Sequence, residues 1–281
     1  MVNIETYNKG NPIKNLNQFL EIVSRLREKW VKPAPIVGDE NQLWFRGQQC
    51  EHWGLSPKFY RKEFKGADEA EIRQEFQSKA LQLIPGRIPQ GKFEWYFLMQ
   101  HYGAPTRLLD WTDNPLVALY FAVEEKNLKD DDLKQNAVVW VLDPSWLNKT
   151  FPLGINGPIL PEWKEANKYL HELEHAFSVG SLSQAKWPAA IEPPHIDRRL
   201  ANQGSRFVIF GQTRDLTATA DYRRSSCRLT RIVISQDIRN DIRRELEYNG
   251  ISQSTLFPDL GHLCDDISRK WRDNTPQKKR K

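Results

Sequence analysis

The sequence predicts an α+β fold in which a mixed or antiparallel sheet is flanked by helices. Helical and strand patterns occur along one chain without repeats, and without the strict alternation that a doubly wound parallel sheet needs. Three strand candidates lie in the middle and late chain: the continuous apolar run at 137–142, and the segments at 207–210 and 229–234. With 281 residues, the chain is long enough to bury a substantial core.

Residues 15–30 have the pattern of an amphipathic helix. Apolar side chains recur at spacings of three and four, which places these five on one face: Leu16, Phe19, Leu20, Val23 and Leu26. The stretch VKPAPIVGDE then breaks the pattern. We therefore expect an N-terminal helix and linker over 1–38, the main domain over 39–265, and a basic, disordered tail over 266–281.

The first half of the main domain alternates short elements with turns. QLWFRG at 42–47 predicts a strand that ends in glycine, and residues 68–84 predict a helix with an acidic first turn. FEWYFLMQHYG predicts a second helix, for which Gly103 is the left-handed cap. The remaining helix candidates are residues 162–174 and residues 236–250, the latter ending at Gly250.

A polar cluster follows in QHYGAPTRLLDWTDNPLVALYFAVE, residues 100–124. TRLLDWT favours a strand, after which Asp113 or Asn114 can cap a helix whose first position is Pro115. That helix is expected to carry one apolar stripe formed by Leu116, Leu119, Tyr120 and Val123. Because a helix N-terminus offers free amides, the region around Thr112 suits an anionic group such as phosphate.

The charge balance bears on the partners. Lysine and arginine number 41 against 36 acidic residues, which gives a net charge of +5 and a pI near 9.0. This excess favours RNA or DNA as a partner through a basic surface, although much of it sits in the terminal KKRK and a protein partner stays open.

The cysteines and the hydropathy pattern bear on the compartment. Cys50, Cys227 and Cys264 show neither CxxC spacing nor companion histidines, so neither a disulfide framework nor a metal site is expected. No apolar run approaches the roughly 18 residues of a membrane span, and the N-terminus lacks the order of a signal peptide. The sequence therefore predicts a cytoplasmic protein without a membrane partner, and it leaves the oligomeric state open.

Four blocks of the sequence match one pattern in the same order. They are WFRGQ at 44–48, QHYGAPTRLLDWTDNPLVALYFA at 100–122, RRLANQGSRFVIFG at 198–211 and LEYNGISQSTLFPDL at 246–260. Together they resemble the FRG domain family, over about residues 40–265. The family is named after an aromatic-Arg-Gly triplet, here Phe45, Arg46 and Gly47.

A more distant resemblance is to ADP-ribosyltransferases. In that family the first core strand ends in Arg-Gly or His-Gly, and a later strand with Ser/Thr-x-Ser/Thr leads into a helix resembling N-P-x-x-A-x-x-F-A. Here Arg46-Gly47 resembles the first element, and residues 109–112 followed by 114–122 resemble the second. The third block of the family supplies a catalytic Glu, whereas Gln203 stands near that position in this chain and Glu192 lies eleven residues earlier.

The resemblance implies an ADP-ribosyltransferase-like fold and an NAD-dependent enzyme that transfers ADP-ribose to a nucleic-acid or protein acceptor, as a toxin or antiphage defence effector. Cleavage of the nicotinamide–ribose bond builds positive charge on the sugar, so the site must hold NAD and place negative charge nearby. The expected catalytic residues are Arg46, Asp110 and Gln203. The expected NAD-binding residues are Gly47, Gln48, His101, Thr106, Arg107, Trp111, Thr112 and Tyr120.

Chemistry suggests a role for several of these residues. Gly47 would bring its backbone against the carboxamide, and Arg46 or Arg107 would hold phosphate in a bidentate fork. Asp110 would take the electrostatic role of the absent Glu, and Thr112 would orient a ribose hydroxyl. An aromatic ring, that of Trp111 or Tyr120, would stack on the ligand.

Other interpretations stay open at this stage. Arg46 could pair with Asp110 or Asp113 in a buried salt bridge, and Gly47 could serve a turn. His101 could interact with a helix dipole, and Trp111 and Tyr120 could be core residues. The alternative functions are a non-catalytic nucleotide or nucleic-acid binding module, and a metal-independent hydrolase or nuclease that uses His101 and Asp110 as an acid–base pair.

Overall fold

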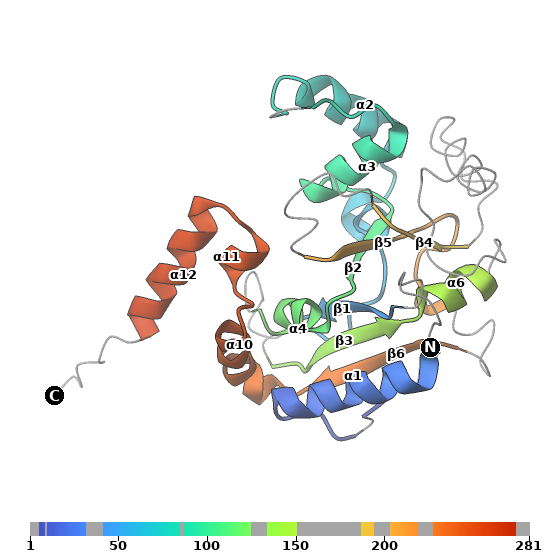
Figure 1. The fold of residues 1–281 in the computed structure, drawn as a ribbon. Helices are drawn as coiled ribbons and strands as arrows, with labels where there is room; N and C mark the ends of the chain where they lie inside the picture. Colours follow the sequence, from blue (N-terminus) through green and yellow to red (C-terminus); the bar gives the residue numbers. More distant parts are fainter. Residues whose placement is uncertain are drawn as a thin grey trace, which may run out of the picture.

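The computed structural model describes residues 6–8, 10–31, 42–84, 87–124, 134–150, 187–193, 203–218 and 227–273 (Figure 1). These residues form an α+β structure around a six-stranded sheet in the order β4-β5-β2-β1-β3-β6, with every neighbouring pair antiparallel. The strands are β1 Trp44–Gln48, β2 Leu108–Thr112, β3 Ala137–Leu142, β4 Ala189–Ile191, β5 Ser205–Ile209 and β6 Leu229–Ile234. The predicted α+β class with an antiparallel sheet is confirmed.

Helices cover both faces of this sheet. They are α1 Leu16–Trp30, α2 Glu69–Ala80, α3 Lys92–His101, α4 Pro115–Val123, α6 Pro144–Thr150, α10 Arg239–Tyr248, α11 Gln253–Leu256 and α12 Leu260–Asp273. One hydrophobic cluster joins α1, α4 and α10 to one face of β1, β3 and β6. A second cluster, rich in tryptophan, packs α6 against the other face. Among the helices of the described ranges, none is long and apolar enough to cross a membrane.

The locally encoded features appear as predicted. Helix α1 buries Leu16, Phe19, Val23 and Leu26 against the sheet, although Leu20 is 39% exposed. Gly103 and Gly250 follow helix ends with φ of 75° and 79°, the left-handed conformation that glycine adopts without steric cost.

Helix α4 differs from the prediction because its burial is not confined to one stripe. Asn114 caps it and Pro115 is its first residue, as expected. Buried side chains point to every side of the helix, however, and Leu116 of the predicted stripe is only partly buried. An apolar helix that is covered all round lies in the core, and α4 indeed packs closely against β1.

Other boundaries also shift. Helix α2 ends at Ala80, and the segment predicted over 236–250 divides into a short 3₁₀ turn followed by α10. Strand β4 has no counterpart among the predictions. Helix α12 runs across the expected boundary at 265 as far as Asp273, and Figure 1 shows it away from the sheet. The helix predicted over 162–174 lies outside the described residues.

Candidate functional site

Strands β1 and β2 separate shortly after they meet. β1 pairs with β3 along its whole length, but its register with β2 is the pair Phe45–Thr112. Beyond that pair a side chain fills the role of a ladder hydrogen bond, because Nη1 of Arg46 donates to the backbone carbonyl of Asp110 at 2.6 Å. The Arg-Gly pair of one motif and the Asp-Trp-Thr of another therefore face each other across a gap in the middle of the sheet.

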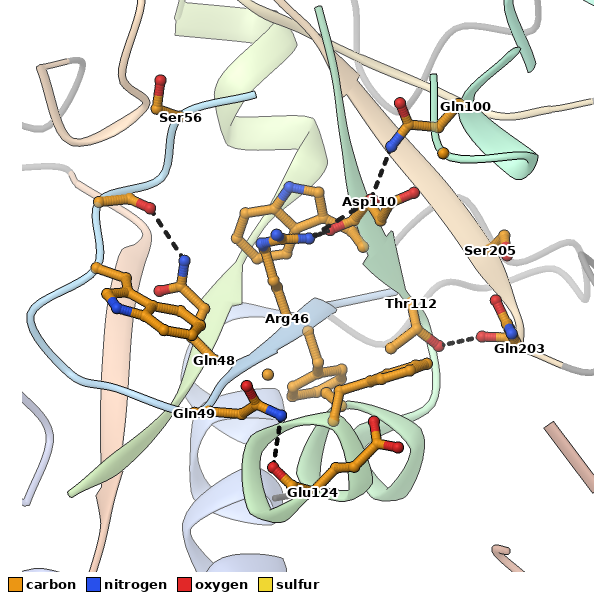
Figure 2. A pocket seen from close by; sticks show the side chains of 18 of the residues that line it. Arg46, Gln48, Gln49, Ser56, Gln100, Asp110, Thr112, Glu124, Gln203 and Ser205 are labelled. Atoms are coloured by element: carbon orange, nitrogen blue, oxygen red, sulfur yellow. Dashed lines mark hydrogen bonds and ion pairs between the residues drawn. The ribbon is translucent and has the colours of Figure 1, made fainter. Parts of the chain in front are cut away.

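A cavity of about 1000 Å³ opens at this gap (Figure 2). Eight of the eleven predicted site residues line it: Arg46, Gly47, Gln48, His101, Asp110, Trp111, Thr112 and Gln203. Residues that the prediction omitted also line it, and those labelled in Figure 2 are Gln49, Ser56, Gln100, Glu124 and Ser205. Phe257 adds the fourth sequence block, so all four blocks meet at one cavity.

Arg46 has an incomplete set of partners. Its side chain is 16% exposed and lies 3.8 Å from the Asp110 carboxylate, while its Nε is buried without a hydrogen-bond partner in the structure. Burial lowers the pKa of Arg46; Asp110 opposes this shift, and the nearby cation Arg61 adds to it. A guanidinium that faces a cavity beside a second cation, with donor capacity unused, suits an anionic ligand.

The Asp110 carboxylate is held from the α3 side. Its side chain is 58% exposed and accepts a hydrogen bond from Nε2 of Gln100 at 2.8 Å. The hydroxyl of Thr106 donates to Oε1 of the same Gln100, which orients that amide. Thr106 is fully buried and does not line the cavity, so the structure places this predicted ligand contact behind Gln100, which it supports.

The backbone amides around the start of α4 form hydrogen bonds within the chain. The Thr112 hydroxyl donates to the carbonyl of Gln203 at 2.6 Å and accepts from the amide of Asn114 at 3.1 Å. The amide of Asp113 donates to the carbonyl of Gly204, and the side chain of Asn114 accepts from the amide of Leu116. The amides of Asp113, Asn114 and Leu116 are therefore already used within the chain, so they give the expected anion site no support.

The ion pairs around β5 show which carboxylate, that of Asp110 or that of Asp113, lies beside Arg46. Arg206 lies 2.7 Å from the Asp113 carboxylate and 3.3 Å from that of Glu192. Asp113 is thus bound to Arg206, and Arg46 faces Asp110 instead. Glu192 does not line the cavity, so it is not placed to substitute for the absent Glu.

Gly47 has a packing reason to be glycine. A Cβ atom at this position would overlap the carbonyl oxygen of Ala118 and lie 2.6 Å from the amide nitrogen of Ala122. The bare side of Gly47 therefore admits the backbone of α4. Its neighbour Gln48 is also fixed by the fold, because it accepts from the Trp140 indole at 2.7 Å and donates to the carbonyl of Gly54 at 3.0 Å.

Two predicted ligand contacts are buried in the structure, and neither lines the cavity. Tyr120 of α4 is 1% exposed in the core, and burial raises the pKa of its hydroxyl. Arg107 is 2% exposed and forms an ion pair with Glu69, which is itself buried. Burial raises the pKa of Glu69, while Arg107 opposes that shift. Neither prediction of a ligand contact is supported, because both side chains are used inside the fold.

Another wall of the cavity combines residues from the end of β1 and from α4 with later parts of the chain. The amide of Gln49 donates to the carbonyl of Glu124 at 2.5 Å, which places a second acidic residue at the cavity wall. The rings of Phe121 and Phe257 meet edge to face, with centroids 6.1 Å apart. Nε2 of Gln203 donates to the carbonyl of Leu256, so its predicted catalytic amide holds this wall together.

The sequence carried partial signals for the omitted residues. Gln100 and Glu124 are the first and last polar residues of the 100–124 cluster, and Phe257 lies in the fourth block. Their positions at the cavity depend on the sheet gap, which no local pattern indicates.

Comparison with known proteins gives one match. No curated protein matches the chain, and no solved structure matches it. A family model described as the FRG domain matches residues 41–131, a segment that contains β1, α2, α3, β2 and α4. This match supports the FRG family for the segment that carries Arg46, Gly47 and Asp110.

Proposed function

We propose that the cavity between β1 and β2 binds a dinucleotide, with NAD as the substrate, and that the protein transfers ADP-ribose from it. The observation that carries this proposal is the incompletely bonded guanidinium of Arg46 at the cavity, with Arg61 close by. Two arginines that face one space repel each other until an anion lies between them, and a pyrophosphate has the charge to do so.

The size and lining of the cavity agree with a ligand of this class. A volume of about 1000 Å³ is at the upper end of the range for small-molecule sites, which suits a dinucleotide better than a mononucleotide. The aromatic rings of Phe121 and Phe257 offer apolar surface at one end of the cavity. Much of the remaining polar lining, including Arg46, Gln48, Asp110 and Thr112, comes from the paired strands β1 and β2, so these side chains need little ordering on binding.

Two acidic residues stand at the cavity where a transferase needs negative charge. When nicotinamide leaves as a neutral molecule, an acceptor atom bonds to the sugar carbon and loses its proton to a base. Asp110 is exposed and oriented by Gln100, and Glu124 lies at the end of α4. We assign the electrostatic role to Asp110, because its carboxylate lies beside Arg46.

Arg46→Ala is expected to weaken NAD binding by about 1.5–3 kcal/mol, on the order of 10- to 100-fold, because hydrogen bonds to a charged group are lost. The measurement is the rise in melting temperature with NAD, beside Arg46→Lys and a control, Arg25→Ala. Arg25 is exposed on α1 and pairs with Glu21, so its replacement should leave binding unchanged. The melting temperature without ligand separates lost binding from lost folding.

Label transfer then tests the reaction itself. Wild-type protein is incubated with radiolabelled NAD and with separate pools of RNA, DNA and cell protein, and both nicotinamide release and transferred label are followed. If NAD raises the melting temperature while no nicotinamide is released, the protein is a non-catalytic nucleotide-binding module. If NAD has no effect on the melting temperature, the proposal is wrong.

Asp110→Asn is expected to reduce the rate of nicotinamide release about 100-fold while NAD still binds. The change removes negative charge near the developing oxocarbenium ion and keeps the size of the side chain. Glu124→Gln is the comparison variant at the same cavity. An Asp110→Asn protein with full turnover, beside an inactive Glu124→Gln protein, would move the electrostatic role to Glu124.

A further inference from the structure

A basic segment borders the cavity. Residues 58–65, KFYRKEFK, carry four cations and one carboxylate, and we call this segment together with residues 101–103 the basic rim. Arg61 and Lys62 line the cavity, and neither forms an ion pair with any residue in the described part of the chain. Lys58 donates to the carbonyl of Gly103 at 2.6 Å, which ties the two parts of the rim together.

Exposed aromatic side chains stand beside these cations. Trp53 lines the cavity and is 42% exposed, and Tyr102 is 62% exposed next to the ring of His101. Exposed aromatic rings beside cations are available to stack on a partner. Tyr60, by contrast, is fixed, because its hydroxyl donates to the carbonyl of Gly211 and Arg214 lies over its ring.

We propose that the basic rim binds single-stranded nucleic acid and leads it to the cavity mouth. Cations spaced along a segment fit a phosphate backbone, and exposed aromatic rings beside them fit unstacked bases. A duplex would hide its bases from Trp53 and Tyr102, and an acidic peptide would leave both rings without a stacking partner. The binding of this strand does not depend on the proposed function. Its role as the acceptor of ADP-ribose does rest on that function.

The cations of the basic rim differ in how close they lie to Arg46. Arg61 is close enough to Arg46 to lower its pKa, so it belongs to the dinucleotide end of the rim. Lys62 lies at the cavity wall, and Lys65 follows it on the exposed surface. Neither lysine is among the residues assigned to NAD, and strand binding is measured without NAD, so changing them reports on the strand alone.

The test is fluorescence anisotropy with a labelled single-stranded RNA, the same sequence as single-stranded DNA, and the DNA duplex, over a series of salt concentrations and without NAD. The variant is Lys62→Glu/Lys65→Glu. The matched control is Lys14→Glu/Lys29→Glu, which makes the same change of net charge at exposed lysines beside and within α1.

Wild-type protein is expected to bind a single strand at least tenfold more tightly than the duplex. The rim variant should lose about tenfold or more in affinity, and its slope of log K against log salt should fall by about 1.4, since each phosphate contact contributes about 0.7. Trp53→Ala should weaken single-strand binding on the order of tenfold, with little change in that slope. The RNA and DNA arms show which strand is preferred.

Two results would overturn the inference. Equal losses in the rim variant and the α1 control would show that net charge alone attracts the strand. Equal binding of duplex and single strand, unaffected by Trp53→Ala, would exclude base stacking at the rim. Because no NAD is present, these outcomes are independent of whether the protein transfers ADP-ribose.

Discussion

Gly47→Ala is expected to lower the free energy of unfolding by about 3 kcal/mol or more, with a fall in melting temperature of about 6–12 °C for a chain of this size. The added methyl group would collide with backbone atoms of Ala118 and Ala122, which cannot move unless α4 shifts away from β1. Both elements border the cavity, so a shift would also widen the site.

The measurement is thermal and chemical denaturation of the purified variant. Gly91→Ala is the control, because a Cβ there meets nothing within 4 Å and its φ lies outside the left-handed region. Gly91 is the N-cap of α3, so its replacement should cost no more than about 1 kcal/mol. An unchanged melting temperature for Gly47→Ala, combined with lost NAD binding, would restore the predicted contact between Gly47 and the ligand.

Arg107→Met is expected to cost about 3–5 kcal/mol, because it leaves the Glu69 carboxylate buried without its cation. Burial raises the pKa of Glu69, and removing Arg107 removes a group that opposes this rise. A carboxyl whose folded pKa is raised contributes its full stability below the ordinary Glu pKa. That stability is lost as the pH rises through the raised value. The destabilisation should therefore be smallest near pH 4 and grow toward neutral pH.

Unfolding of Arg107→Met over a range of pH tests this expectation, beside the double variant Glu69→Leu/Arg107→Met. The double variant removes both charges, so it should recover most of the lost stability and show little of the pH dependence. A single variant that unfolds like the wild type but no longer responds to NAD would instead support the predicted phosphate contact of Arg107.

Features encoded by neighbouring residues could be predicted from the sequence. The cap at Asn114, the glycine stop at Gly103 and the buried face of α1 depend on spacings within a few residues. The apolar run of β3 is buried at every position, as its composition indicates. The grouping of Arg46, Asp110 and Thr112 at one site followed from the order of the blocks.

Features that depend on distant partners could not be predicted. The partner of Arg107 lies 38 residues earlier, so the same arginine is equally compatible with a ligand phosphate when only its neighbours are known. Gly47 gives no local sign that a helix backbone fills the space beside it. The amphipathic pattern of α12 indicates a helix, but the charged residues at the terminus favour a disordered tail.

The separation of β1 and β2 also bears on how the motif-bearing segment can be handled as a fragment. Residues 41–131 contain both strands, yet β1 is paired on its other side with β3 and β2 with β5, which lie downstream. A chain cut at 131 would keep the Arg-Gly motif but expose two strand edges, and it would lose the wall at Phe257. The site therefore needs more of the chain than residues 41–131. A fragment or graft limited to these residues would carry the motif side chains without β3 and β5, the strands that hold β1 and β2 apart.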